Sequence, residues 1–112
     1  MMLYSSAVRL DPPRAHLTVS GELDIFTTPL VQRDIEAALD GGCVDFTVDV
    51  AAVTFVDASG LGSFVHLHNT AKTSGGSLKF VAASSAFLWV SSVAGLLSAF
   101  DLDQPLAERL LA

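Results

Sequence analysis

The chain has 112 residues, of which 51% are hydrophobic and 16% are charged, and its formal net charge is -6. This composition excludes a disordered tail and predicts one domain with a single core, spanning residues 1–112. The six Lys and Arg residues are scattered along the sequence, so no basic stripe favours nucleic-acid binding. There is one cysteine, no signal-peptide pattern and no apolar run of bilayer-spanning length. We therefore expect a cytoplasmic protein that does not insert into a membrane.

Two short strands are predicted at the start of the chain, over residues 3–10 and 15–20. Between them lies Asp11-Pro12-Pro13, where the prolines have a restricted φ and no N–H group to donate to a sheet. Such a segment is typical of a turn. The two strands are expected to form a hairpin.

The period of the apolar residues then changes from that of a strand to that of a helix. Thr28 is a candidate cap, Pro29 suits the first helical position, and Gly41-Gly42 predicts where the helix ends. The apolar residues at helical spacing are Val31, Ile35, Ala38 and Leu39. The pattern predicts a first helix that buries one face.

Strands and helices alternate in the rest of the chain. The residue patterns predict a strand at 44–50 with an apolar approach at 53–56, a helix at 59–73, a strand at 78–83, a helix at 84–94, a short strand at 100–102 and a terminal helix at 106–111. The second helix is expected to present Leu61, Phe64, Val65, His68 and Lys72 on one face, and the third Phe87, Val90 and Ala94. The alternation predicts an α/β fold with a mixed sheet of four to five strands and helices mainly on one face.

The segment most informative about function is Asp57-Ala58-Ser59-Gly60, which directly follows the apolar approach. Ser59 is expected at a helix N-terminus, where unpartnered amides and the helix dipole would receive a phosphate. This pattern predicts a switch and not a catalytic centre. Two plainer alternatives are that Ser59 is only an N-cap and that Asp57 only accepts hydrogen bonds from the first-turn amides.

Four segments, in this order and at compatible spacing, resemble the STAS domain of bacterial anti-sigma factor antagonists. They are Gly21-Glu22-Leu23-Asp24, then Phe55-Val56-Asp57-Ala58-Ser59-Gly60-Leu61-Gly62, then Gly75-Gly76, and finally Val93-Ala94-Gly95-Leu96. The resemblance covers nearly the whole chain. It implies a binding module for partner switching in transcription regulation. The unphosphorylated protein binds an anti-sigma factor that is also a serine kinase of the GHKL type, a sigma factor is released, and a phosphatase reverses the phosphorylation that ends binding.

Carried onto this sequence, the resemblance makes Ser59 the phosphorylation site, and Ala58 stands where many members have a second serine. The segment 24–28 matches the loop that helps to form the docking face in the family. In this chain Ile25 and Phe26 make that loop more apolar than usual. The expected partner-binding residues are Asp24, Ile25, Phe26, Thr27, Asp57, Ala58, Ser59, Gly60, Leu61 and Gly62.

No cofactor, metal site or catalytic group is expected. His66 and His68 are two residues apart on a helix and point to different faces, and Cys43 is more simply a small residue at a strand start than a redox centre. The third helix lacks charge around Leu88 and Trp89, which makes it a candidate contact for a weak homodimer or a second partner. The alternative function is a STAS subunit of a membrane lipid ABC transport system, docked on its ATPase.

Overall fold

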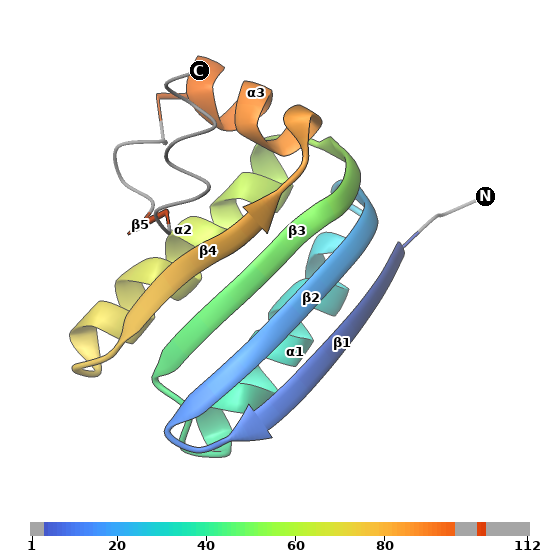
Figure 1. Cartoon of the computed structure of the whole chain (residues 1–112). Coiled ribbons are helices and arrows are strands. Elements are labelled where there is room, and N and C mark those ends of the chain that lie inside the picture. Colours follow the sequence, from blue (N-terminus) through green and yellow to red (C-terminus); the bar gives the residue numbers. More distant parts are fainter. Residues whose placement is uncertain (1–3, 96–100, 103–112) are drawn as a thin grey trace.

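The computed structural model describes residues 4–95 and 101–102. In chain order the elements are β1 (Tyr4–Asp11), β2 (Arg14–Leu23), α1 (Thr28–Asp40), β3 (Asp45–Val56), α2 (Ala58–Thr73), β4 (Ser77–Ala83), α3 (Ser85–Val93) and β5 (Asp101–Leu102). The sheet has the order β1-β2-β3-β4-β5, with β1 antiparallel to β2 and the remaining neighbours parallel. Helices α1 and α2 cover the same face (Figure 1). The predicted α/β class, mixed sheet and one-sided helices are confirmed.

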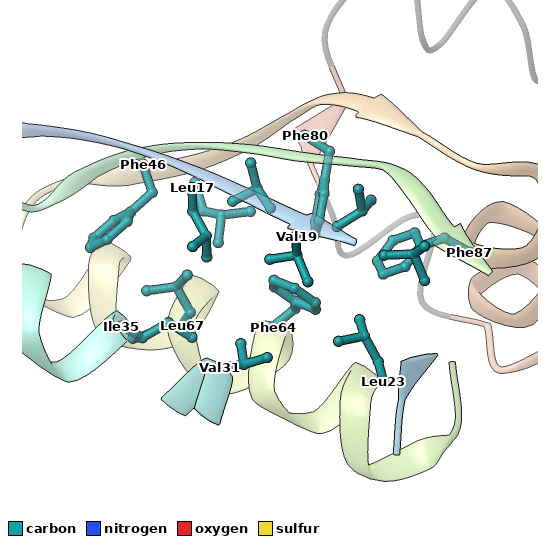
Figure 2. Close-up of a cluster of buried hydrophobic side chains, with 14 of the residues drawn as sticks. Leu17, Val19, Leu23, Val31, Ile35, Phe46, Phe64, Leu67, Phe80 and Phe87 are labelled. Atoms are coloured by element: carbon teal, nitrogen blue, oxygen red, sulfur yellow. The ribbon is translucent and has the colours of Figure 1, made fainter. Parts of the chain in front are cut away.

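The core lies between this face of the sheet and the helices. Inward residues of β2, β3 and β4 are buried at alternate positions, and the outward residues between them are half-buried or exposed. The rings of Phe64 on α2, Phe80 on β4 and Phe87 on α3 meet with centroids 5.2 to 5.8 Å apart (Figure 2). These contacts are edge-on or tilted, which is the favoured geometry of aromatic pairs. All three elements therefore share one core.

The parallel strands β2, β3 and β4 all begin at one edge of the sheet and end at the other. We call these the amino edge and the carboxyl edge. At the carboxyl edge, β3 continues past the last β4 pair, Val50 with Ala83, and α3 follows β4 directly. The amide of Ser84 donates to the carbonyl of Val50 at 3.1 Å, which ties the start of α3 to β3. Helices α1, α2 and α3 thus all start at the carboxyl edge (Figure 1).

Several predicted boundaries need correction. The β1–β2 hairpin is confirmed, but the predicted strand at 44–50 and the approach at 53–56 form one twelve-residue strand, β3, which starts at Asp45, because register shifts against β2 and β4 absorb the broken alternation. The N-cap position of α1 is Thr27 and not Thr28. Residues 101–102 of the predicted strand at 100–102 form β5, which pairs with β4, whereas residue 100 and the predicted helix at 106–111 lie outside the described residues.

The predicted helix faces were partly wrong. On α2, Leu61 and Phe64 are buried as expected, but His68 is half-exposed and Lys72 exposed, since the inward row continues through Leu67 and Ala71. On α3 the buried residues are Phe87, Leu88 and Ser91, and Ala94 is exposed. Trp89 is 69% exposed, so the uncharged third helix has a large apolar side chain on its surface. Within the described part of the chain, no helix combines the length and hydropathy that crossing a bilayer would require.

Candidate functional site

Two segments that are far apart in sequence leave the carboxyl edge side by side. Leu23 and Val56, the last residues of β2 and β3, are paired in register. The amide of Asp57 donates to the carbonyl of Leu23 at 3.1 Å. This bond joins the start of the β2–α1 loop to the start of α2, so the predicted loop and the predicted serine motif belong to one site.

The β2–α1 loop is held by a dense set of hydrogen bonds. One oxygen of the Asp24 carboxylate, Oδ1, accepts from the amides of Phe26 at 2.9 Å and Thr27 at 3.0 Å, as in an Asx turn. The buried hydroxyl of Thr27 donates to the carbonyl of Glu22 at 2.7 Å and accepts from the Asp24 amide at 2.9 Å. These contacts order the backbone but leave two large side chains outside. Ile25 is 66% exposed and Phe26 75% exposed.

At the start of α2, the capping group is Asp57 and not Ser59. Its carboxylate accepts from the amides of Ser59 at 2.9 Å and Gly60 at 3.1 Å, which satisfies two first-turn donors. Ser59 is already inside the helix, and its side chain is exposed. The expectation that first-turn amides would receive a phosphate on Ser59 therefore needs correction, because these two amides are already bonded to Asp57.

The two glycines that flank Leu61 have different surroundings. Gly60 is buried, and a Cβ there would lie 2.8 Å from the Cβ of Leu23 and 2.9 Å from a methyl group of Val56. Only glycine allows α2 to approach the strand ends this closely. Gly62 is exposed, and a Cβ there would meet no atom within 4 Å. Gly60 thus serves packing, whereas Gly62 leaves an open surface one turn after Asp57.

The structure sorts the expected partner-binding residues by accessibility. The exposed ones are Ile25, Phe26, Ala58, Ser59 and Gly62. Asp24 and Asp57 are half-buried and hold the two loops through their carboxylates, while Thr27, Gly60 and Leu61 are buried. The exposed members are accessible at the surface of the carboxyl edge, and the others give that surface its shape.

One apolar residue of this edge was not among the expected site residues. Phe55 is 49% exposed at the end of β3, where it pairs with Glu22. The sequence analysis treated 53–56 as a continuous apolar approach, but Val53 and Val56 are the buried members. No simple alternation separates them from Phe55, because the β2–β3 register shifts at this point. Phe55 adds a third exposed large apolar side chain to the carboxyl edge.

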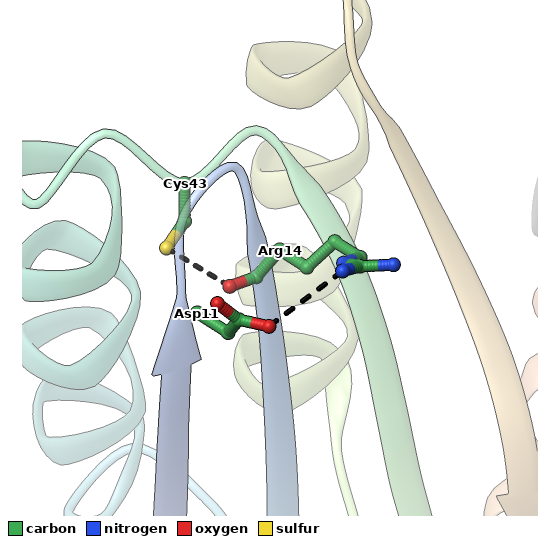
Figure 3. A network of polar contacts seen from close by, with 3 residues as sticks. All are labelled: Asp11, Arg14 and Cys43. Atoms are coloured by element: carbon green, nitrogen blue, oxygen red, sulfur yellow. Dashed lines mark hydrogen bonds and ion pairs between the residues drawn. The ribbon is translucent and has the colours of Figure 1, made fainter.

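The cysteine and histidine side chains that were considered as candidate redox or metal sites have the following contacts. The thiol of Cys43 is buried and donates to the backbone carbonyl of Arg14 at 3.2 Å (Figure 3). His66 is exposed on α2, and the Nδ1 atom of His16 is bonded to the Thr47 hydroxyl at 2.7 Å on the sheet. Within residues 4–95 and 101–102, no three His, Cys, Asp or Glu side chains gather as metal ligands.

Known proteins share sequence and fold with this chain. A family model described as "Mlab, STAS domain" matches residues 6–111. The "Anti-sigma-B factor antagonist" of Bacillus subtilis (strain 168) is 27% identical over 87 residues, which are 78% of this chain and 79% of that protein.

Two solved structures have the same fold. An anti-sigma factor antagonist from Mycobacterium paratuberculosis is 24% identical, with 97% of this chain and 92% of that chain covered and a TM-score of 0.79. The Bacillus cell fate determinant SpoIIAA in its phosphorylated form is 16% identical, with coverages of 96% and 100% and a TM-score of 0.69. With the family model matching nearly every residue, the chain belongs to the STAS-domain family.

Proposed function

We propose that this protein is an anti-sigma factor antagonist that binds a serine-kinase anti-sigma factor while Ser59 is unphosphorylated, so that a sigma factor is released. Phosphorylation of Ser59 ends the binding, and a phosphatase restores it. The kinase is of the GHKL type. The relative from Bacillus subtilis and the structural neighbour from Mycobacterium paratuberculosis are named anti-sigma factor antagonists, and the SpoIIAA structure is of a phosphorylated form. Both findings support this reading.

The observation that carries the proposal is the placement of Ser59. Its exposed side chain follows directly after a capped helix start, which the Asp57 amide ties to the end of β2. Beside this point, the ordered β2–α1 loop exposes Ile25 and Phe26. Large exposed apolar side chains on an ordered loop are typical anchors of protein–protein interfaces. One surface would therefore combine partner anchors with a hydroxyl that a kinase can reach.

The charge of the site explains how phosphorylation would end binding. A phosphoserine carries about -1.5 to -2 charges at neutral pH. On Ser59 it would lie close to the Asp57 carboxylate, and the amides of Ser59 and Gly60 already donate to that carboxylate. The added charge would thus be left facing the partner, on a chain whose net charge is -6. Repulsion and the cost of removing water from the phosphate would both weaken a close-packed contact.

No catalytic role is part of this proposal. The exposed hydroxyl of Ser59 has a carboxylate two residues away, but that carboxylate caps the helix. In the segment that the structure describes, no histidine bonds to Ser59 to act as its base. Ser59 is therefore proposed as an acceptor for another enzyme's phosphoryl group.

Capture of partners from a lysate of the native cell tests the proposal. Tagged wild type and Ser59→Ala are expected to retain a GHKL-type kinase, whereas Ser59→Asp is expected to lose it. Asn69→Asp is the matched control, because it adds one negative charge at an exposed position of α2, ten residues along the helix from Ser59. Its capture should equal that of wild type.

The alternative function makes a different prediction in the same experiment. A STAS subunit of a lipid transport system would retain an ABC ATPase, and Ser59→Asp would have no specific effect. Recovery of that ATPase with wild type, without any kinase, would contradict the proposal and favour the alternative.

A further inference from the structure

A row of four polar side chains crosses the sheet face that α1 and α2 leave uncovered. Arg9 on β1 pairs in register with His16 on β2, His16 pairs with Thr47 on β3, and Thr47 pairs with Lys79 on β4. Ala15 and Leu17, which flank His16 in β2, point into the core, so His16 points to the opposite, open face. The row lies near the amino edge, at the other end of β3 from Ser59.

The row lines a hollow of about 390 Å³. Three of the chain's six Lys and Arg residues line it, namely Arg9, Arg14 and Lys79, in a protein of net charge -6. Cations that are scattered in the sequence are thus gathered in the fold.

Both carboxylates of the hollow are already engaged. Asp11 lies 3.6 Å from the guanidinium of Arg14 (Figure 3), and Asp45 accepts a hydrogen bond from the Ser77 hydroxyl at 3.1 Å. Arg9 and Lys79, by contrast, form no ion pair with any side chain that the structure describes. The hollow thus holds three cations, of which only Arg14 is ion-paired among the described residues, against the two carboxylates of Asp11 and Asp45.

The centre of the row is held in a fixed arrangement. The 2.7 Å bond between His16 Nδ1 and the Thr47 hydroxyl leaves the second ring nitrogen, Nε2, without a hydrogen-bond partner among the described residues. Adjacent strands are about 4.8 Å apart, so Arg9 and Lys79 start roughly 14 Å from each other, on either side of this pair. Both side chains are long and exposed, and from these positions they can reach inward over the histidine and the threonine.

We propose that this row binds a phosphate monoester group. The guanidinium of Arg9 would contact two phosphate oxygens, since its planar fork matches them, and the Lys79 ammonium would approach from the other side as a point charge. The Nε2 atom of His16 would contact the same phosphate group from the side of the sheet. The site is separate from the docking surface at the carboxyl edge and does not rest on the proposed function.

An NMR titration of the full ¹⁵N-labelled chain with inorganic phosphate tests the proposal, with chloride used to keep the ionic strength constant. Phosphate is expected to cause saturable shifts in the amides of the row. Arg9→Gln and Lys79→Gln should each weaken binding at least about ten-fold, because each removes one charge-assisted contact. Arg33→Gln is the matched control, since it removes an equal charge from an exposed position on α1.

The outcomes are distinct. Shifts that do not saturate, or an equal loss of binding in Arg33→Gln, would mean general charge screening and would overturn the proposal. Two further probes identify the source of the group once phosphate binding is established. Saturable binding of glycerol 3-phosphate without sedimentation on phosphatidic acid vesicles would assign a small soluble ligand. Sedimentation on those vesicles that is lost in Arg9→Gln would assign a lipid headgroup.

Discussion

The two edges of the same parallel strands present different chemistry. At the carboxyl edge, the polar groups of Asp24, Thr27 and Asp57 are used up in ordering the backbone, and large apolar side chains remain outside. Near the amino edge, the open face of the sheet carries charged groups and hydroxyls in register, whereas the opposite face of the same strands is apolar and packs in the core. The carboxyl edge therefore suits a protein partner and a switchable hydroxyl, whereas the amino edge suits a small anion.

The difference follows from how the chain leaves the sheet. Strands β2, β3 and β4 each end at the carboxyl edge and lead into a helix, so the helix N-termini and their capping groups gather there. Along the strands themselves, side chains alternate between the core and the open face, and neighbours in register stand side by side. The function proposed for the carboxyl edge depends on loops and caps. The anion site proposed near the amino edge depends on register.

The largest effect is expected from disrupting the packing of α2 against the ends of β2 and β3 at the carboxyl edge. In Gly60→Ala the new Cβ would overlap Leu23 and Val56, and we expect a loss of about 1 to 3 kcal/mol in the free energy of unfolding. Gly62→Ala is the matched control. It lies in open space on the same helix, so it should be neutral or stabilising by up to about 1 kcal/mol. Urea unfolding measures both. Equal effects at the two glycines would contradict the packing role of Gly60.

The next prediction tests whether exposed apolar side chains at the carboxyl edge anchor the partner. Phe26→Ala is expected to weaken binding of the kinase by about 2 kcal/mol, or roughly 30-fold, because it removes a large apolar contact from the interface. Leu10→Ala truncates an exposed apolar residue at the amino edge and should leave the affinity unchanged. Isothermal calorimetry compares the two. A loss in Leu10→Ala as large as in Phe26→Ala would remove the distinction between the edges.

A smaller effect separates the cap from the switch. Asp57→Ala should lower the free energy of unfolding by about 1 kcal/mol, because the amides of Ser59 and Gly60 lose their acceptor. Ser59→Ala should leave stability nearly unchanged, since Ser59 is inside the helix and is not its cap. This revises the expectation that the serine itself provides capping energy. Chemical unfolding of both variants decides the question, and a larger cost for Ser59→Ala would reverse the assignment.

The smallest expected effect concerns α3, which also starts at the carboxyl edge. Trp89→Glu should change the free energy of unfolding by less than about 0.5 kcal/mol, because the side chain is largely exposed. The variant should still be phosphorylated at Ser59, and any weak homodimer should shift toward monomer. Light scattering and circular dichroism provide the two readings. Unfolding of the variant would show that Trp89 supports the core.

Much of the fold could be predicted from the sequence, because local signals and packing agree. Gly41-Gly42 ends α1 as predicted, and the two prolines after Asp11 turn the chain between β1 and β2. The carboxyl-edge site was also within reach, since the family motif and the capping chemistry of Asp57 are both local. The sequence left two residues open as the cap of α2, because Asp57 and Ser59 are both suitable residue types. The structure confirms the alternative in which Asp57 accepts hydrogen bonds from the first-turn amides.

The open-face row could not be predicted in the same way. Arg9 and Lys79 are 70 positions apart in the sequence, and they belong to one row only because four strands are aligned in a particular register. A shift of one residue in any pair would send a member to the core face. The exposure of Phe55 escaped prediction for a related reason, because it depends on shifts in the β2–β3 register. Such features become visible only in the assembled sheet.

The most direct test of the central claim compares the protein with and without phosphate on Ser59. After incubation with the purified kinase and ATP, peptide mapping should place the label on Ser59, and Ser59→Ala should carry none. Calorimetry should then show that the phosphorylated chain binds the kinase at least ten-fold more weakly, about 1.4 kcal/mol, than the unmodified chain. Label that persists in Ser59→Ala, or equal affinities of the two forms, would contradict the account.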